Sequence, residues 1–485
     1  MLRELSLAVA VSTLWSTQLQ AAPAPLASKT DLISVYNQAV DNDADLAASR
    51  ADFAATQEGV PQARSGLLPN LSAGVDVNNT RASVPTTYAG SRSDVVANRS
   101  GNSWQATLSQ PLFRADRWYQ LKAAQATNEQ AALELSYTEQ NLILESAERY
   151  FAVLRAQDNL ATAKAEENAF KHQLDQSNER FNVGLTDKTD MLQSQASYDT
   201  SRASRIEAER QVDDAFQALV TLTNREYNAL QGVVHTLPVL VPSPNDAKAW
   251  VDTATQQNLN LLATNYAITA AEETLRQRKA GHAPTLDAVA QYEKGDNDNF
   301  QLNNPAPIQG TTYGSDVSQR TIGLRLNIPI YSGGLTSSQV REAAARLNQA
   351  EYQREGLRRQ VVENTRNLHR AVNSDVEKVQ ARRQSIISNQ SAVEATEIGY
   401  QVGTRNIVDV LDAQRQLYAS VRDYNNSRYD YILDNLRLKQ AAGTLSPQDL
   451  HDLGRYLKAD YNPDRDFLPP DLARAAQEML RPARQ

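Results

Sequence analysis

Two aspartates three residues apart are the side chains whose type and spacing most clearly suggest a function. Asp409 and Asp412 follow the pair Val402–Gly403, and Asp190 holds the matching place after Val183–Gly184. A spacing of three puts both carboxylates on one face of a helix. If three copies surrounded a pore, they would form two rings of carboxylates, which favour cations. The alternative for such a pair is an ordinary solvated helix face.

Side chains for enzyme chemistry are not grouped in this sequence. The five histidines lie far apart without metal-ligand spacing, and neither a glycine-rich phosphate loop nor a G-x-S-x-G elbow occurs. The formal net charge is −8 and there is no dense basic block, which argues against a nucleic-acid partner. We therefore predict a protein that is not an enzyme and has no catalytic residue, cofactor or metal.

Two very long helices must position the carboxylates. Residues 115–180 contain neither glycine nor proline, and 336–401 are interrupted only by Gly356. Each run corresponds to roughly 100 Å of helix, far longer than usual in globular proteins, and predicts coiled-coil helices over 115–182 and 336–401. Shorter helical runs are expected to pack beside them, over 31–60, 186–230, 246–280 and 405–442.

Four segments alternate apolar and polar residues with a period of two: 69–79, 103–110, 284–293 and 320–329. Their length suits tilted transmembrane strands with one lipid-facing and one water-facing side. Long polar loops are predicted within the pairs, over 80–102 and 294–319. The alternative is a half-buried sheet of a soluble protein. Four strands cannot close a barrel, whereas two chains would give eight and three would give twelve.

The second half of the chain repeats the first at an offset of about 215 to 219 residues. This internal duplication predicts repeat 1 over 23–230 and repeat 2 over 246–442, each with a helix, two strands, a long helix, a tip and a return helix. A proline-rich linker, 231–245, joins them in an equatorial region. Residues 443–485 are predicted to wrap this region and end in a loose tail.

The N-terminus is typical of an export signal over residues 1–22. Arg3 precedes an apolar run and then small residues, with cleavage expected after Ala21, Ala22 or Ala24. A buried N-terminal helix is the alternative. No later run of 18 apolar residues exists, so a membrane location would require a β-barrel. The sequence has no cysteine, hence no disulfide and no lipid-anchoring thiol.

The segment GYQVGTRNIVDVLDAQ (399–414) resembles the tip of the TolC family of outer-membrane secretion and efflux channels, and RFNVGLTDKTD (180–190) resembles its partner tip. The similarity extends from about residue 31 to 453. It implies an α+β membrane protein, a homotrimer with a twelve-stranded β-barrel, four strands per chain, continued by a long α-helical coiled-coil tunnel across the periplasm.

By residue, the resemblance places the links that close the tip on Tyr400 and Arg405, both bonding to Asp190. Glu179 stands where the resembled tip has an amide, so the outer link is expected to differ electrostatically. The lumenal carboxylate rings fall on Asp409 and Asp412. The turns implied to meet a periplasmic adaptor comprise Val183, Gly184, Leu185, Val402, Gly403 and Thr404.

The function implied is export through the outer membrane of a Gram-negative bacterium. The cargo would be proteins, by type I secretion, or drugs and other small molecules. The implied partners are outer-membrane lipid, a periplasmic adaptor (membrane fusion) protein and an inner-membrane transporter of the ABC or RND type. The rival interpretation is a periplasmic coiled-coil scaffold or adhesin without a pore.

Overall fold

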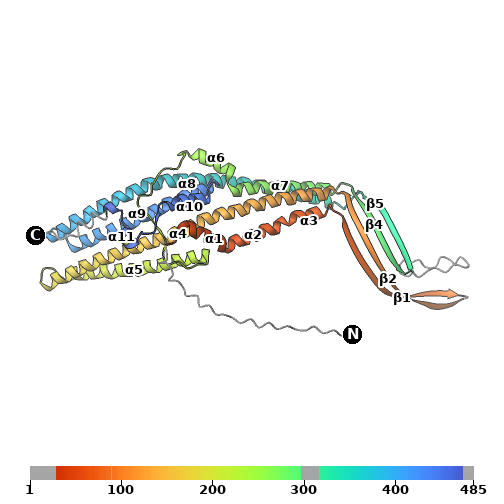
Figure 1. Ribbon diagram of the computed structural model, residues 1–485, viewed down its shortest axis with the longest axis horizontal. Helices are drawn as coiled ribbons and strands as arrows, with labels where there is room; N and C mark the ends of the chain where they lie inside the picture. Colours follow the sequence, from red (N-terminus) through yellow and green to blue (C-terminus); the bar gives the residue numbers. More distant parts are fainter. Residues whose placement is uncertain (1–28, 89, 297–315, 473–485) are drawn as a thin grey trace, which may run out of the picture.

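The computed structural model describes residues 29–88, 90–296 and 316–472. The predicted signal peptide, the centre of the second loop and the end of the predicted tail lie outside these residues. The molecule is strongly elongated, with helices forming one long arm and four strands the other (Figure 1). The described chain begins beside the middle of the helical arm, where Lys29 donates a hydrogen bond to the backbone carbonyl of Tyr461.

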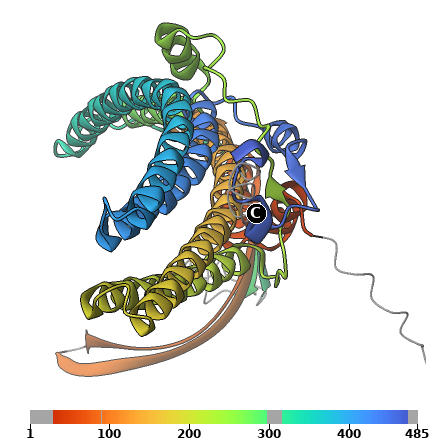
Figure 2. The ribbon, with the colours of Figure 1, turned by 90° about the vertical axis from the view of Figure 1, so that its left-hand side faces the viewer.

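Two long helices span the helical arm. α4 runs over Ala115–Asn182 and α8 over Leu335–Gln401. Each turns back into a shorter antiparallel helix, α5 over Lys188–Thr223 and α9 over Ile407–Ala441, to give two hairpins. Figure 2 shows the hairpins end-on as two separate pairs, α4 with α5 in yellow and α8 with α9 in blue.

Beyond the end of each return helix, shorter helices pack along the rest of the long helices. α1 (Leu32–Asn42), α2 (Ala44–Gln57) and α3 (Gly59–Ser65) pack on α4. α6 (Ala247–Gln257) packs on α8, and α7 (Leu259–Ala280) lies between α4 and α8. Within the described chain, no helix is both long enough and apolar enough to cross a membrane.

Single helices over 31–60 and 246–280 were wrong predictions, because polar side chains restart the helix inside each run. Asp43 adopts an extended conformation and accepts a 2.7 Å hydrogen bond from the backbone N–H of Leu46. Asn258 does the same for Leu261 at 3.0 Å, and its amide also donates to the carbonyl of Ala441. Asp and Asn compete with the helical backbone in this way and favour N-cap positions.

The sheet contains four antiparallel strands in the order β1-β2-β4-β5. They are β1 (Asn70–Tyr88), β2 (Ser91–Phe113), β4 (Thr285–Asp296) and β5 (Asp316–Asn327). The predicted loop over 80–102 is wrong, because β1 and β2 stay paired as far as Tyr88 and Ser91. A polar sequence can still pair its backbone, and Gly90, with φ of 85°, allows the tight turn.

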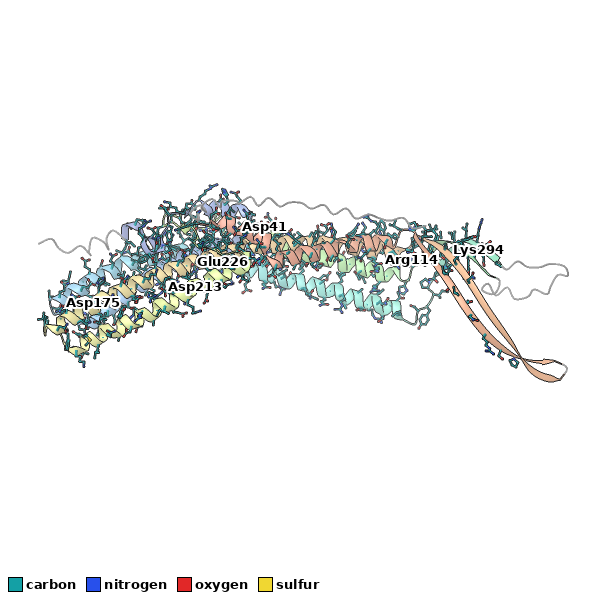
Figure 3. All side chains as sticks on the ribbon, turned by 60° about the horizontal axis from the view of Figure 1, so that its bottom comes forward. Asp41, Arg114, Asp175, Asp213, Glu226 and Lys294 are labelled. Carbon is teal, nitrogen blue, oxygen red and sulfur yellow. The ribbon has the colours of Figure 1, made fainter. Side chains whose placement is uncertain are left out.

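One face of the sheet is apolar. The residues of this face are largely exposed on β1, β2 and β5 and half-buried on β4. Cross-strand partners share a face, and Leu71 lies opposite Leu108, as Val75 lies opposite Trp104. The exposed apolar side chains include Leu71, Val75, Val77, Trp104, Leu108, Ile322, Leu324 and Leu326. Arg114, at the junction of β2 and α4 in Figure 3, forms an ion pair with Asp287 at 3.3 Å and fixes the sheet to the helices.

The largest hydrophobic core lies midway along the helices, in the equatorial region. Large buried side chains from α4 and α9, such as Tyr150, Phe151 and Tyr429, form its centre. Around them, β3 (Gly232–Val233) pairs with β6 (Leu457–Lys458), and α10 (Pro447–Gly454) and α11 (Pro463–Asp466) complete a belt. The linker and the C-terminal segment therefore join both repeats around one core.

Candidate functional site: the helical tips and their carboxylates

Both hairpin tips use the same backbone turn. Gly184 and Gly403 have φ of 77° and 80°, in the left-handed region where a side chain is strained. After the first glycine, the N–H of Leu185 donates to the carbonyl of Arg180 at 2.8 Å. After the second, the N–H of Thr404 donates to Gly399, also at 2.8 Å. The turns thus end α4 and α8 with left-handed glycine caps.

The tip turns project large apolar side chains into solvent. Val183, Leu185 and Val402 are 67%, 70% and 68% exposed. These values are high for apolar residues, and the three residues belong to the turns that follow α4 and α8 at the free ends of the hairpins, which Figure 1 shows. Exposed apolar residues grouped at one end of a molecule are typical of a contact surface.

The two return helices, α5 and α9, also start with the same kind of side-chain cap. Asp187 accepts a 3.0 Å hydrogen bond from the N–H of Asp190, and Asn406 accepts one of 2.9 Å from the N–H of Asp409. The carboxylate of Asp409 accepts in turn from the N–H of Asn406 at 3.4 Å, completing a capping box. Sequence reasoning missed both caps, although an Asp or Asn three residues before an acidic residue is the signal for them.

The two aspartates of the second tip each have an arginine of the same chain nearby. Asp409 lies 3.9 Å from Arg405, and Asp412 lies 2.7 Å from Arg415. The side chains of Asp409 and Asp412 are 38% and 61% exposed. Sequence analysis did not single out Arg415, which the i, i+3 spacing of opposite charges could have revealed. The carboxylates are thus accessible to ions, although the nearby arginines partly neutralise their negative charge.

The predicted links to Asp190 are not made within the chain described here. The carboxylate of Asp190 accepts a 2.5 Å hydrogen bond from the hydroxyl of Thr186, two residues beyond the Gly184 turn. Arg405 faces Asp409 instead. The ring of Tyr400 lies under the Arg180 guanidinium, 4.8 Å from the ring centre, and its hydroxyl is buried without a partner among the described groups.

Behind the tips, α4 packs against the α8–α9 hairpin. Phe170, Tyr400, Ile407, Val410 and Leu411 form a small core there. Polar bonds hold each hairpin together beside it. The hydroxyls of Ser177 and Ser194 lie 2.9 Å apart between α4 and α5, and the Gln414 amide donates to Glu397 at 3.0 Å between α9 and α8. Glu179 is exposed, and its backbone carbonyl accepts from Val183.

A buried charged cluster lies far from the tips, in the equatorial region. The carboxylate of Asp158 on α4 accepts hydrogen bonds from the hydroxyls of Tyr429 at 2.7 Å and Tyr461 at 2.5 Å. Burial raises the pKa of Asp158 to about 6, although the two hydroxyls and nearby Arg428 oppose this shift. Arg428 also donates to the carbonyl of Val234 at 2.9 Å. Among the described residues, no group of three or more His, Asp or Glu could hold a metal ion.

Two hairpins of very long helices, matched exposed turns and a terminal four-stranded sheet define the class of outer-membrane tunnel proteins. The sequence comparison agrees with the structure: the model of the outer membrane efflux protein family matches residues 35–225 and 250–444. The chain belongs to this family, and it is a protein of the outer membrane of Gram-negative bacteria. The two matched ranges lie close to the two predicted repeats, 23–230 and 246–442.

Similar proteins cover nearly the whole chain. Outer membrane protein TolC of Vibrio cholerae is 37% identical over 88% of this chain and 94% of its own length, and that of Escherichia coli is 34% identical over 89% and 86%. Alkaline protease secretion protein AprF of Pseudomonas aeruginosa is 26% identical over 86% and 85%. The structure of the Campylobacter jejuni CmeC outer membrane channel superposes with a TM-score of 0.72 at 16% identity, over 93% of this chain and 98% of that one.

These relatives confirm the predicted family, fold class and location. They also place the chain among channels that work with efflux or secretion machinery. The pore-less scaffold is not favoured. The roles of individual tip residues stay predictions.

Proposed function

We propose that three copies of this chain form an export channel through the outer membrane. Each copy contributes four strands to a twelve-stranded barrel and two helical hairpins to a periplasmic tunnel. The channel carries proteins, drugs or other small molecules, and performs no chemistry of its own. Energy comes from an inner-membrane transporter of the ABC or RND type, which is joined to the tips by a periplasmic adaptor protein.

The single observation that carries this proposal is the sheet with an exposed apolar face and two unpaired edges. Within the described residues, β1 and β5 each pair on one side only. Free strand edges need a partner, and pairing β5 of one copy with β1 of the next satisfies both. The exposed row of Leu, Val and Ile then faces lipid, while residues such as Gln105 and Arg325 face water.

The tips suit a gate that opens reversibly. An exposed ion pair contributes only about 0–1 kcal/mol, so a few copies of such a link can close a mouth and still yield to a partner. Arg405 has Asp409 as a partner when it does not reach Asp190. The exposed Val183, Leu185 and Val402 supply the apolar contacts that an adaptor needs.

The test is electrical and biochemical. The full-length protein, purified in detergent, is expected to migrate as a trimer that heat dissociates, and to give single-channel currents in planar lipid bilayers. A protein that forms trimers but never conducts, even after insertion is verified by protease protection, contradicts the channel and favours the scaffold.

The adaptor is tested separately by cross-linking. A photo-reactive residue at Leu185 or Val402 should capture an adaptor in intact cells, whereas one at exposed Gln211, away from the tip, should not. Capture at all three positions to the same extent would argue against a specific tip surface. Loss of a secreted protein, or of drug resistance, on deletion of the chain would identify the cargo.

A further inference from the structure

A polar cavity, partly open to solvent, lies directly behind the candidate gate, between α4 and the α8–α9 hairpin. Its volume is about 360 Å³. Ala169, Val393, Val410 and Leu417 supply apolar wall, and polar side chains from all three helices complete it. Neither Lys nor Arg lines it. The cavity therefore sits where any relative movement of the two hairpins must change the packing.

Three polar groups in this cavity have no hydrogen-bond partner among the described groups. They are the Nε2 of Gln173 on α4, the hydroxyl of Tyr400 on α8 and the Oε1 of Gln414 on α9. The residues are only 7%, 9% and 8% exposed. A buried polar group without a partner is destabilising, so three in one cavity strongly favour an occupant that can both donate and accept.

Water meets this requirement better than an ion or an apolar molecule. An amide N–H needs an acceptor, an amide oxygen needs a donor, and the hydroxyl can use either. A water molecule takes about 30 Å³ of liquid, so the cavity has room for several. An anion would meet the carboxylate of Glu397, which lines the same cavity. We propose that this cavity binds an ordered water cluster that gives the Tyr400 hydroxyl an alternative to its gate partner.

The water cluster regulates the opening of the tip, and this role rests on the channel function proposed above. A tyrosine hydroxyl that is satisfied by bound water loses little when it is not bonded to Asp190. The cluster therefore stabilises the arrangement in which the tip is free to open. Removing the groups that hold the water should shift the balance toward the closed tip.

The decisive variant is Gln173→Leu, which keeps the approximate volume of the side chain but removes the amide. Gln416→Leu on α9 is the matched control, because Gln416 is exposed and does not line the cavity. Gln173→Asn retains an amide and should behave like the parent. High-resolution crystal structures should show ordered water bonded to Tyr400 in the parent, in Gln416→Leu and in Gln173→Asn. This water should be absent in Gln173→Leu. A dry parent cavity, or an organic molecule in it, overturns the proposal.

Single-channel recording tests the coupling to the gate. Gln173→Leu should lower the open probability roughly fivefold, as expected for one lost hydrogen bond. The same change made in a Tyr400→Phe background should have no effect, because the hydroxyl is already absent. An equal effect in both backgrounds overturns the switch. If the parent does not conduct at all, the channel proposal and this switch fail together, and the crystal structures still decide whether the cavity binds water.

Discussion

The hydroxyl of Tyr461 donates a 2.5 Å hydrogen bond to the carboxylate of Asp158, although 303 positions separate the two residues. Tyr429 of α9 donates to the other oxygen of the same carboxylate. Asp158 is 1% exposed, so both oxygens depend on these hydroxyls. One buried carboxylate thus joins the long helix of repeat 1, the return helix of repeat 2 and the C-terminal segment.

Tyr429→Phe is expected to lower the free energy of unfolding by about 1.5–3 kcal/mol, because it leaves one oxygen of a buried carboxylate without a donor. Tyr431→Phe is a useful comparison, since its hydroxyl bonds only to the backbone of Leu240 and its loss should cost about 1 kcal/mol. Thermal unfolding of the purified protein, followed by tryptophan fluorescence, measures both. Equal costs would show that the charge on Asp158 is unimportant.

The equatorial region should respond to acid through His235. Burial lowers the pKa of His235 to about 3, and Arg428 adds to this shift. The unfolded chain therefore binds this proton more readily, so stability is lost as the pH falls below about 6.5, by roughly 2 kcal/mol at pH 5. Asp158 acts in the opposite direction, because its raised pKa adds stability as the pH falls below about 6.

His235→Phe separates the two effects, since the ring can still stack on Tyr424. The variant loses the bond to the carbonyl of Asp466 at every pH, and this cancels when two pH values are compared. Its melting temperature should fall less than that of the parent between pH 7 and pH 5, or should rise. An unchanged difference would mean that His235 does not contribute to acid sensitivity.

Gly443 should not tolerate a side chain. Its φ is 75°, and an added Cβ would lie 2.2 Å from the carbonyl oxygen of Gln257. Gly443→Ala is therefore expected to destabilise the protein by about 2–4 kcal/mol, through strain and steric displacement of α6. Gly454→Ala is the control, because nothing lies within 4 Å of its Cβ position. Circular dichroism melting curves compare the two.

Cation selectivity should depend on the balance of charge at the second tip. Asp409→Asn combined with Asp412→Asn should weaken cation selectivity and block by multivalent cations while trimers still form. Arg415→Gln should act oppositely, because it frees Asp412 from a 2.7 Å ion pair. Reversal potentials in a salt gradient across a planar bilayer measure both. Unchanged potentials in all variants would place the selective constriction elsewhere.

If Tyr400 and Arg405 hold the tip closed, removing them should open the channel in steps. Tyr400→Phe removes a hydroxyl and Arg405→Ser removes a charge, and neither change touches the strands. Each should raise the mean open probability or conductance by a small factor, and the double variant by more, because each link contributes only about 1 kcal/mol. Cells should also become sensitive to large antibiotics such as vancomycin. A double variant that inserts normally but conducts like the parent would exclude these residues.

Much of the fold could be predicted from the sequence because its signals are local and repeated. The absence of glycine and proline over long runs predicts the long helices, and period-two alternation predicts four strands. The hairpin extension to Tyr88 and Ser91 could not be predicted in this way, since backbone pairing places little demand on polar side chains. The helix breaks at Asp43 and Asn258 depend on single capping residues within otherwise continuous patterns.

The candidate site was predicted less completely. The glycine turns, the aspartates and the nearby arginines are visible as motifs, whereas the choice of Asp409 rather than Asp190 as the partner of Arg405 depends on side-chain rotamers. The bond between Asp158 and Tyr461 joins residues too far apart for any periodicity to reveal. The cavity behind Tyr400 results from the packing of three helices, which the pattern of one chain segment does not specify.

The near-equal lengths of the long helices, Ala115–Asn182 and Leu335–Gln401, have a mechanical consequence. Both start near the sheet and end in the same type of glycine turn, so together they set the distance between the sheet and the tips. Inserting seven residues into α4 alone would put the two tips out of level by about 10 Å. Matched insertions in α4, α5, α8 and α9 would increase the distance between the sheet and the tips and preserve the contacts between helices. Length is thus a property that the two repeats can change only in step.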